Sequence, residues 1–90
     1  MRIKKGFVLR TVCGEHVIVG EGLGAVDFGK LLSVNESAAW LWEQATAMGD
    51  FTTEALAERL CEEYDEEADV AHRDVEALIG EWKSVGVIEE

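Results

Sequence analysis

Strand-like and helix-like segments do not alternate along this chain, and this order is the feature that most constrains its fold. Extended, β-branched runs are confined to residues 1–34, and apolar residues at helical spacing follow from Asn35 onward. The two patterns meet in "KLLSVNESAAWLWEQ" (residues 30–44) with no loop between them. Segregated strands and helices predict an α+β domain, because a small antiparallel sheet needs helices to cover its apolar face. A chain of 90 residues is expected to form a single domain, residues 1–90.

Three extended segments are predicted in the first part of the chain. Residues 7–12 and 15–20 are two β-type runs, and the Cys13-Gly14 pair between them suits a tight hairpin in which Gly14 takes a positive φ angle. "GEGLG" predicts a loop, after which residues 25–34 predict a further extended segment. Together these segments predict a three-stranded antiparallel sheet.

Three helices are predicted in the second part of the chain. Asn35 caps the first, which ends near residues 48–50, and Thr52 caps the second, which ends near Tyr64. The third covers about residues 69–85. The expected buried stripe of the second helix is Leu56, Ala57, Leu60, Cys61 and Tyr64. That of the third helix is Ala71, Val75, Leu78, Ile79 and Trp82.

The net charge of −11 is unevenly distributed along the sequence. Residues 1–34 carry five Lys and Arg against three Asp and Glu, whereas residues 35–90 carry three against sixteen. Nucleic acids and anionic membranes attract cationic proteins, so we expect this chain to bind neither. The acidic part favours a basic partner or serves only as a solubilising surface. No apolar run is long enough for a membrane span or a signal peptide, so a cytoplasmic protein with free thiols is expected.

The patterns that resemble ligand or catalytic sites fail on spacing or context. "GEGLGA" fits the glycine pattern of a dinucleotide-binding loop, but a strand-like segment follows it instead of a helix. Four side chains of zinc-ligand type are present, namely Cys13, His16, Cys61 and His72. The second pair lacks the spacing of a zinc finger, and a Cys–His nucleophile needs an orienting group and a pocket. "CEEYDEEAD" lacks the calcium-loop pattern, so no metal, cofactor or catalytic residue is predicted.

The remaining motifs are identified by their order rather than by any catalytic signature. They are Val34-Asn35-Glu36 after an apolar strand, then Trp42, then Glu63-Tyr64-Asp65 after an acidic Leu-rich segment, and finally Asp74-Val75 through to Gly86-Val87-Ile88. In this order they resemble the PqqD family, named for a small protein of pyrroloquinoline quinone biosynthesis. The similarity covers nearly the whole chain.

The resemblance implies a three-stranded sheet with three helices, similar to a winged helix-turn-helix. It also implies a non-catalytic protein that binds the leader part of a ribosomally made precursor peptide. Such a protein presents the peptide to a modifying enzyme, often a radical S-adenosylmethionine enzyme. The leader is expected to pair as a fourth strand with the third strand, in the groove beside the third helix. Relatives serve quinone biosynthesis and other peptide pathways.

The implied binding site combines the third strand with the third helix. Its expected strand residues are Phe28, Lys30, Leu31, Leu32, Ser33 and Val34, and its expected helix residues are Asp74, Val75, Leu78, Ile79 and Trp82. Unpaired N–H and C=O groups at the outer edge of the strand favour the addition of another strand.

The flank of the third helix that faces this groove stays open at the level of sequence. One flank carries Asp74 and Glu81. The other carries His72 and Lys83. An acidic flank in the groove favours a leader that contains Lys or Arg.

Two other functions compete with leader binding. A winged-helix fold suggests DNA binding, but that function requires a basic recognition helix. The third helix has two basic residues, Arg73 and Lys83, against the acidic residues Asp69, Asp74, Glu76 and Glu81. A structural protein that dimerises through its free strand edge is the second alternative, so either a monomer or a weak homodimer is expected.

Overall fold

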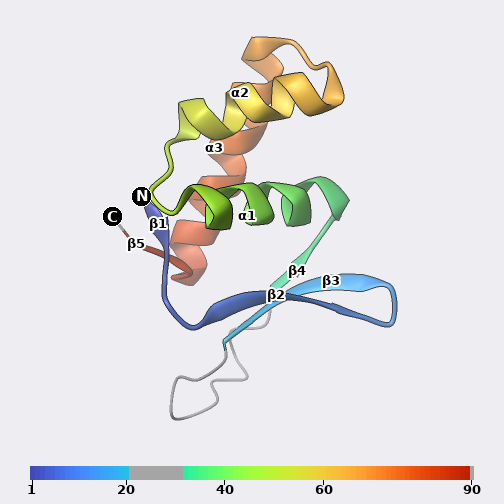
Figure 1. The fold of residues 1–90 in the computed structure, drawn as a ribbon, viewed down its shortest axis with the longest axis vertical. Helices are drawn as coiled ribbons and strands as arrows, with labels where there is room; N and C mark the ends of the chain where they lie inside the picture. The colour runs from blue at the N-terminus through green and yellow to red at the C-terminus, as the bar shows by residue number, and fades with distance from the viewer. Residues whose placement is uncertain (21–31, 90) are drawn as a thin grey trace.

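The computed structural model of the chain describes residues 1–20 and 32–89 (Figure 1). The elements are, in chain order, β1 (Arg2–Ile3), β2 (Phe7–Val12), β3 (Glu15–Gly20), β4 (Leu32–Val34), α1 (Glu36–Met48), α2 (Thr53–Tyr64), α3 (Ala68–Val85) and β5 (Ile88–Glu89). In Figure 1 the sheet lies at the bottom, α1 crosses the middle, α2 lies at the top, and α3 runs behind both helices. The predicted α+β fold is confirmed, whereas the predicted loop after Gly20 and the start of the third extended segment lie outside the described residues.

The β2–β3 hairpin has the predicted two-residue turn. The two strands pair antiparallel, and Val12 lies opposite Glu15 next to the turn. Both turn residues have a positive φ angle, 52° at Cys13 and 80° at Gly14. This is the pattern of a type I′ turn, whose twist matches that of the flanking strands. The sequence predicted a positive φ angle at Gly14, and the structure adds Cys13.

The third strand completes an antiparallel sheet in the order β2-β3-β4. In β4, Leu32 lies opposite Ile18, and Val34 lies opposite His16. β3 is therefore the central strand, while β2 and β4 are the outer strands. The predicted three-stranded antiparallel sheet is confirmed.

The change from β4 to α1 takes place at Asn35, as the sequence predicts. Asn35 keeps an extended backbone, and its side-chain oxygen accepts a hydrogen bond of 2.8 Å from the backbone N–H of Ala38. This bond satisfies one of the exposed amides in the first turn of the helix. Because one residue ends the strand and caps the helix, the direction of β4 is tied to that of α1.

The other predicted helix ends are also confirmed. The hydroxyl of Thr52 accepts a hydrogen bond of 3.1 Å from the backbone N–H of Ala55 at the start of α2. Gly86 ends α3 with a φ angle of 81°, and its N–H donates to the carbonyl of Trp82. A left-handed residue of this kind commonly ends a helix and is most often glycine.

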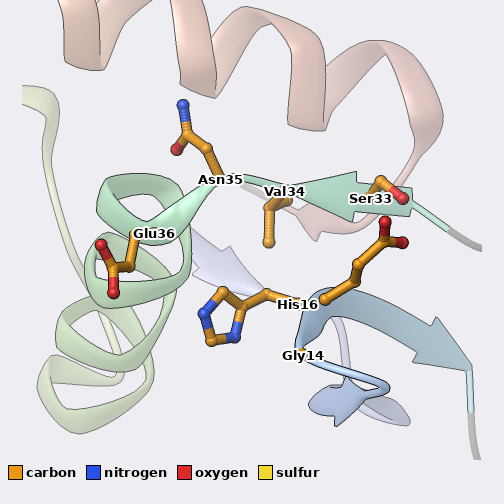
Figure 2. Close-up of a pocket in the computed structure, with 7 residues that line it drawn as sticks. Gly14, His16, Ser33, Val34, Asn35 and Glu36 are labelled. Carbon is orange, nitrogen blue, oxygen red and sulfur yellow. The ribbon is translucent and has the colours of Figure 1, made fainter.

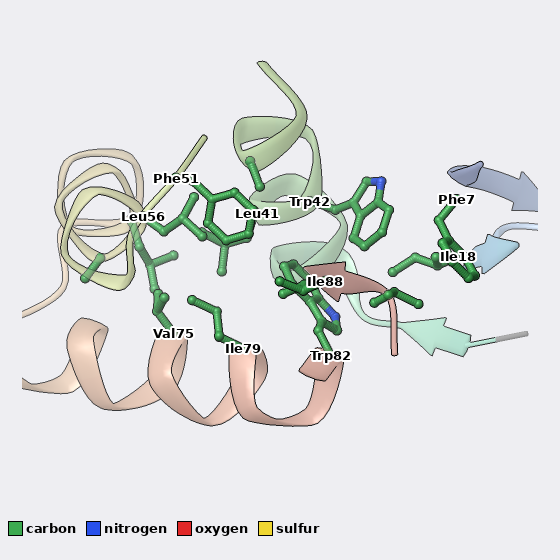
Figure 3. Packing of buried hydrophobic residues seen from close by; sticks show 14 of the residues in the cluster. Phe7, Ile18, Leu41, Trp42, Phe51, Leu56, Val75, Ile79, Trp82 and Ile88 are labelled. Atoms are coloured by element: carbon green, nitrogen blue, oxygen red, sulfur yellow. The ribbon is translucent and has the colours of Figure 1, made fainter. Parts of the chain in front are cut away.

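The hydrophobic core lies between the three helices and one face of the sheet (Figure 3). Trp42 of α1 and Trp82 of α3 meet edge to face, with ring centroids 5.2 Å apart. Phe7 and Ile18 bring the sheet into the same cluster. The other buried members are Leu41, Ala45, Phe51, Leu56, Ala57, Leu60, Ala71, Val75, Ile79, Val87 and Ile88. This packing fixes α1 and α3 relative to the sheet.

Two features differ from the sequence-based expectation. β1 and β5 form a separate antiparallel pair, with Ile3 opposite Ile88; strands of two residues are too short to show a periodic pattern. Tyr64, predicted in the buried stripe of α2, is instead 45% exposed. It is the last residue of α2, where the helix extends beyond the core.

Candidate functional site

The outer edge of β4 is the first part of the candidate site. β4 pairs with β3 on one side, and no other described strand pairs with its second edge. Edge strands offer unpaired N–H and C=O groups to an incoming strand. The sheet has a second outer strand, β2, so the edge alone does not define the site.

Side chains alternate along β4 between the core and solvent. Leu32 and Val34 are half-buried and pack against the hydrophobic core, whereas Ser33 is exposed. The alternation expected for a strand with one buried face is therefore present over these three residues. Leu32 and Val34 thus anchor the strand to the core, and no described strand occupies its outer backbone edge.

A hollow of about 380 Å³ lies between α1, α2 and α3 and reaches Asn35 at the end of β4. We call this hollow the acidic groove. Its apolar lining residues are Ala38, Leu41, Leu60, Ala77 and Leu78. Its polar lining residues are Asn35, Ser37, Tyr64, Glu66, Asp74 and Glu81. Three carboxylates thus surround an apolar surface next to the strand edge.

The acidic flank of α3 faces this groove. Asp74 and Glu81 line it together with Leu78, which packs against the edge of the core. His72 lies on the opposite flank, with its ring nitrogens 3.9 Å from Glu54 and 3.4 Å from Glu76. Of the two flanks that the sequence left open, the acidic one therefore lines this hollow.

Tyr64, the last residue of α2, also lines the acidic groove. Its ring meets that of Trp40 edge to face, with centroids 5.6 Å apart. Pairs of this geometry are favourable beyond the area that they bury. The exposed Tyr64 ring thus packs against Trp40 of α1 where it lines the groove.

A second hollow, of about 390 Å³, lies on the other side of the β4–α1 junction (Figure 2). Val34 and His16 project into it from neighbouring strands, and Asn35 points away from them. The imidazole Nδ1 of His16 is 3.1 Å from the hydroxyl of Thr11. The other residues that line this second hollow are Gly14, Glu15, Ser33 and Glu36. Asn35 lines both hollows.

The predicted site residues fall into three groups. Phe28, Lys30 and Leu31 lie outside the described residues. Leu32, Ser33 and Val34 form β4, and Asp74 and Leu78 line the acidic groove. Val75, Ile79 and Trp82 are at most 3% exposed in the core. These last three side chains have almost no surface for a peptide to contact. They pack α3 against the hydrophobic core instead.

Sequence reasoning did not assign Asn35, Tyr64 and Glu66 to the site. Asn35 was interpreted only as a helix cap, and Tyr64 only as a core residue. Glu66 lies in the turn between α2 and α3, where acidic density suggested a solvated loop. Glu66 and Tyr64 lie eight and ten residues before Asp74, the first groove-lining residue of α3, and this spacing matches no pattern that a single sequence reveals.

Two further observations concern other kinds of site. Within residues 1–20 and 32–89, no three His, Cys, Asp or Glu side chains gather in a way that could hold a metal ion. Among the described helices, none has the length and apolar character needed to cross a membrane.

Residues 15–88, most of the chain, match the family described as Coenzyme PQQ synthesis protein D (PqqD). The chain belongs to the PqqD family. The resemblance found in the sequence is thereby confirmed. Among curated proteins, none matches this PqqD-family chain in sequence.

Two solved structures share the fold of this PqqD-family chain. "TbiB1 in Complex with the TbiA(beta) Leader Peptide" superimposes with a TM-score of 0.75 and 16% identity, over 99% of this chain and 95% of that one. "Lasso peptide synthetase B1 complexed with the leader peptide" gives a TM-score of 0.72 and 20% identity, over 99% and 96%. At these identities the similarity establishes the fold.

Proposed function

We propose that this PqqD-family chain is a non-catalytic protein that binds the leader of a ribosomally made precursor peptide as an added strand on β4. The observation that carries the proposal is the outer edge of β4, which has no partner strand in the described chain and ends beside the acidic groove. In this mode of recognition, main-chain hydrogen bonds supply affinity and pockets for alternate side chains supply selectivity.

The comparisons support the same class of ligand. Both solved structures with this fold are complexes with a leader peptide. The acidic groove also agrees with a binding role, because it combines carboxylates with apolar side chains.

The bound leader would then be presented to an enzyme that modifies another part of the same peptide. We propose a radical S-adenosylmethionine enzyme for this role, on the strength of the resemblance to the PqqD family. The chain would act in this assembly by positioning the peptide, and the chemistry would be that of its partner.

Amide hydrogen exchange with candidate leaders tests the site. The probes are synthetic peptides that cover the short reading frames next to the gene. We expect a bound peptide to slow exchange in Leu32–Val34, because its strand would take up hydrogen-bonding groups at the outer edge. Protection confined to Phe7–Val12 would show that the peptide uses the other outer strand, β2, and would contradict the proposal.

Proline substitution in β4 gives a second test. Successive N–H groups of a strand point to alternate sides, so Leu32→Pro and Ser33→Pro remove one N–H from each side. The variant that loses the N–H facing β3 should be destabilised. The variant that loses the outward N–H should keep its melting temperature and lose peptide binding. An outward proline variant that stays folded and binds with unchanged affinity would refute β4 as the docking strand.

The outer edges of β2 and β4, which no other described strand pairs with, also allow a competing role as a structural protein that pairs with a second copy of itself. Light scattering with and without peptide distinguishes the two. A leader-binding protein should bind peptide as a monomer, or release its partner copy when peptide is added. A dimer that peptide leaves undisturbed favours the structural role.

A further inference from the structure

The acidic groove carries negative charge along α3 and at its end near α2. Asp74 and Glu81 lie two helical turns apart on α3, about 10 Å along the helix axis. Glu66 contributes a third carboxylate from the turn before α3. No Lys, Arg or His side chain of the described chain lines the groove. Leu41 and Leu78 contribute to the apolar surface between the charges.

These carboxylates are not neutralised by their neighbours. Within the two described segments, Glu66, Asp74 and Glu81 form no ion pair. One oxygen of Glu66, Oε2, is also buried and has no hydrogen-bond donor among the described residues. A buried acceptor without a donor destabilises a protein, so a donor supplied from outside the chain is favoured at this position.

We propose that the acidic groove receives a Lys or Arg side chain of the leader peptide and so selects basic leaders. The inference rests on the proposed function, since the side chain would project from the peptide strand that pairs with β4. Asn35 directly follows β4 and lines the groove, so a peptide residue near this end of the strand can reach it. Lys and Arg have an apolar stem and a cationic head, which matches an apolar surface bordered by carboxylates.

Charge in the groove acts on the choice of peptide more than on overall affinity. A cationic side chain pairs with carboxylates that are otherwise unpartnered, whereas an acidic side chain meets like charge in a partly desolvated hollow. Discrimination against acidic leaders therefore accompanies the preference for basic ones. Salt screens partly exposed charges, so the preference should weaken as ionic strength rises.

A peptide-display selection tests the inference without knowledge of the natural leader. The full 90-residue chain is immobilised, and a library of random peptides is enriched on it and sequenced. Parallel selections use Asp74→Asn/Glu81→Gln, and a control, Glu58→Gln/Glu62→Gln. The control changes the net charge equally, at exposed positions of α2 that do not line the groove.

We expect the unaltered chain and the control to enrich peptides with Lys or Arg at one fixed position. In Asp74→Asn/Glu81→Gln this preference should fall about tenfold, which corresponds to ~1.4 kcal/mol at 25 °C. Norleucine in place of the selected Lys, on the peptide side, should cause a similar loss without any change in the protein. Thermal unfolding of each variant checks that the fold is retained.

The other outcomes overturn the inference in distinguishable ways. Enriched peptides without a basic position would refute the charge selection and leave the proposed function standing. A basic preference that falls equally in the groove variant and the control would mean attraction to net charge rather than to the groove. If no peptide is enriched on the unaltered chain, both the inference and the proposed function are wrong.

Discussion

Cys13 occupies a backbone conformation that its side chain disfavours. Its φ angle of 52° lies in the left-handed region, which among the described non-glycine residues is shared only with Asp65. A type I′ turn requires a positive φ angle at both central positions and is most often built from Asn-Gly. Asn tolerates this region better than Cys, because its side chain can form hydrogen bonds with the nearby backbone.

Replacing Cys13 by Asn should therefore stabilise the protein. We expect Cys13→Asn to raise the free energy of unfolding by about 0.5–1 kcal/mol, and the β-branched Cys13→Val to lower it. The exposed position of Cys13 means that little packing changes. Urea unfolding with an unchanged m value measures the difference. Equal midpoints for Asn and Val would show that the turn geometry does not limit stability.

At the scale of elements, the join between β4 and α1 has two functions. Asn35 caps α1 through the N–H of Ala38, and its side chain also accepts a hydrogen bond of 3.1 Å from the hydroxyl of Ser37. The same residue lines both hollows beside β4. A change at this cap is therefore expected to affect both the stability of the helix and the geometry of the candidate site.

A comparison of two caps separates these effects. Asn35→Ala and Thr52→Ala should each lower the free energy of unfolding by about 1 kcal/mol, since each removes a side-chain acceptor from a helix start. Only Asn35→Ala should also speed amide exchange in Leu32–Val34 and weaken peptide binding. Asn35→Ser, which can still cap, should restore stability. Equal binding by both alanine variants would show that the Asn35 cap does not hold the site.

The local elements could be predicted because their causes are local. The hairpin turn, the caps at Asn35 and Thr52, and the glycine that ends α3 each depend on a few adjacent residues. The β1–β5 pair could not be predicted, because its two short strands come from opposite ends of the chain. Tyr64 was misplaced because helical spacing identifies a stripe but not the point where the stripe leaves the core.

The candidate site was predicted only in part for a related reason. Sequence identified β4 and α3 as its elements, and Asp74 and Leu78 do line the groove. The flank of α3 that faces the groove depends on how α3 packs against α1 and α2 together. The spacing of residues within α3 cannot determine this packing. Val75, Ile79 and Trp82 were included because apolar residues suit both a groove and a core, and burial places them in the core.

At the scale of the whole molecule, the first three residues connect distant parts of the fold. Ile3 pairs with Ile88 in β5, and the carbonyl of Met1 accepts a hydrogen bond of 2.7 Å from the N–H of Phe51, between α1 and α2. The N–H of Lys4 donates to the carbonyl of Val87. Strand pairing at this corner thus covers one end of the core with backbone from both ends of the described chain.

Removal of residues 1–3 should destabilise the whole domain. Loss of the backbone hydrogen bonds and of the cover over Ile88 is expected to lower the free energy of unfolding by about 2–4 kcal/mol. Arg2→Ala is the control, since it removes only a solvent-exposed ion pair with Glu89 at 3.9 Å and should change stability by less than about 0.5 kcal/mol. Guanidinium unfolding followed by tryptophan fluorescence measures both. A truncated chain with an unchanged midpoint would show that this corner is dispensable.

The β1–β5 pair has a practical consequence for any attachment to this domain. The pair lies beside the last turn of α1, whereas Asn35 lies at the start of that helix (Figure 1). Because α1 has 13 residues, its two ends are about 20 Å apart. A fluorophore, tether or fused enzyme joined near either terminus would start from the same corner and leave the strand edge unobstructed. Exchanging an N-terminal fusion for a C-terminal one should consequently leave a fused enzyme at a similar distance from a peptide bound at β4.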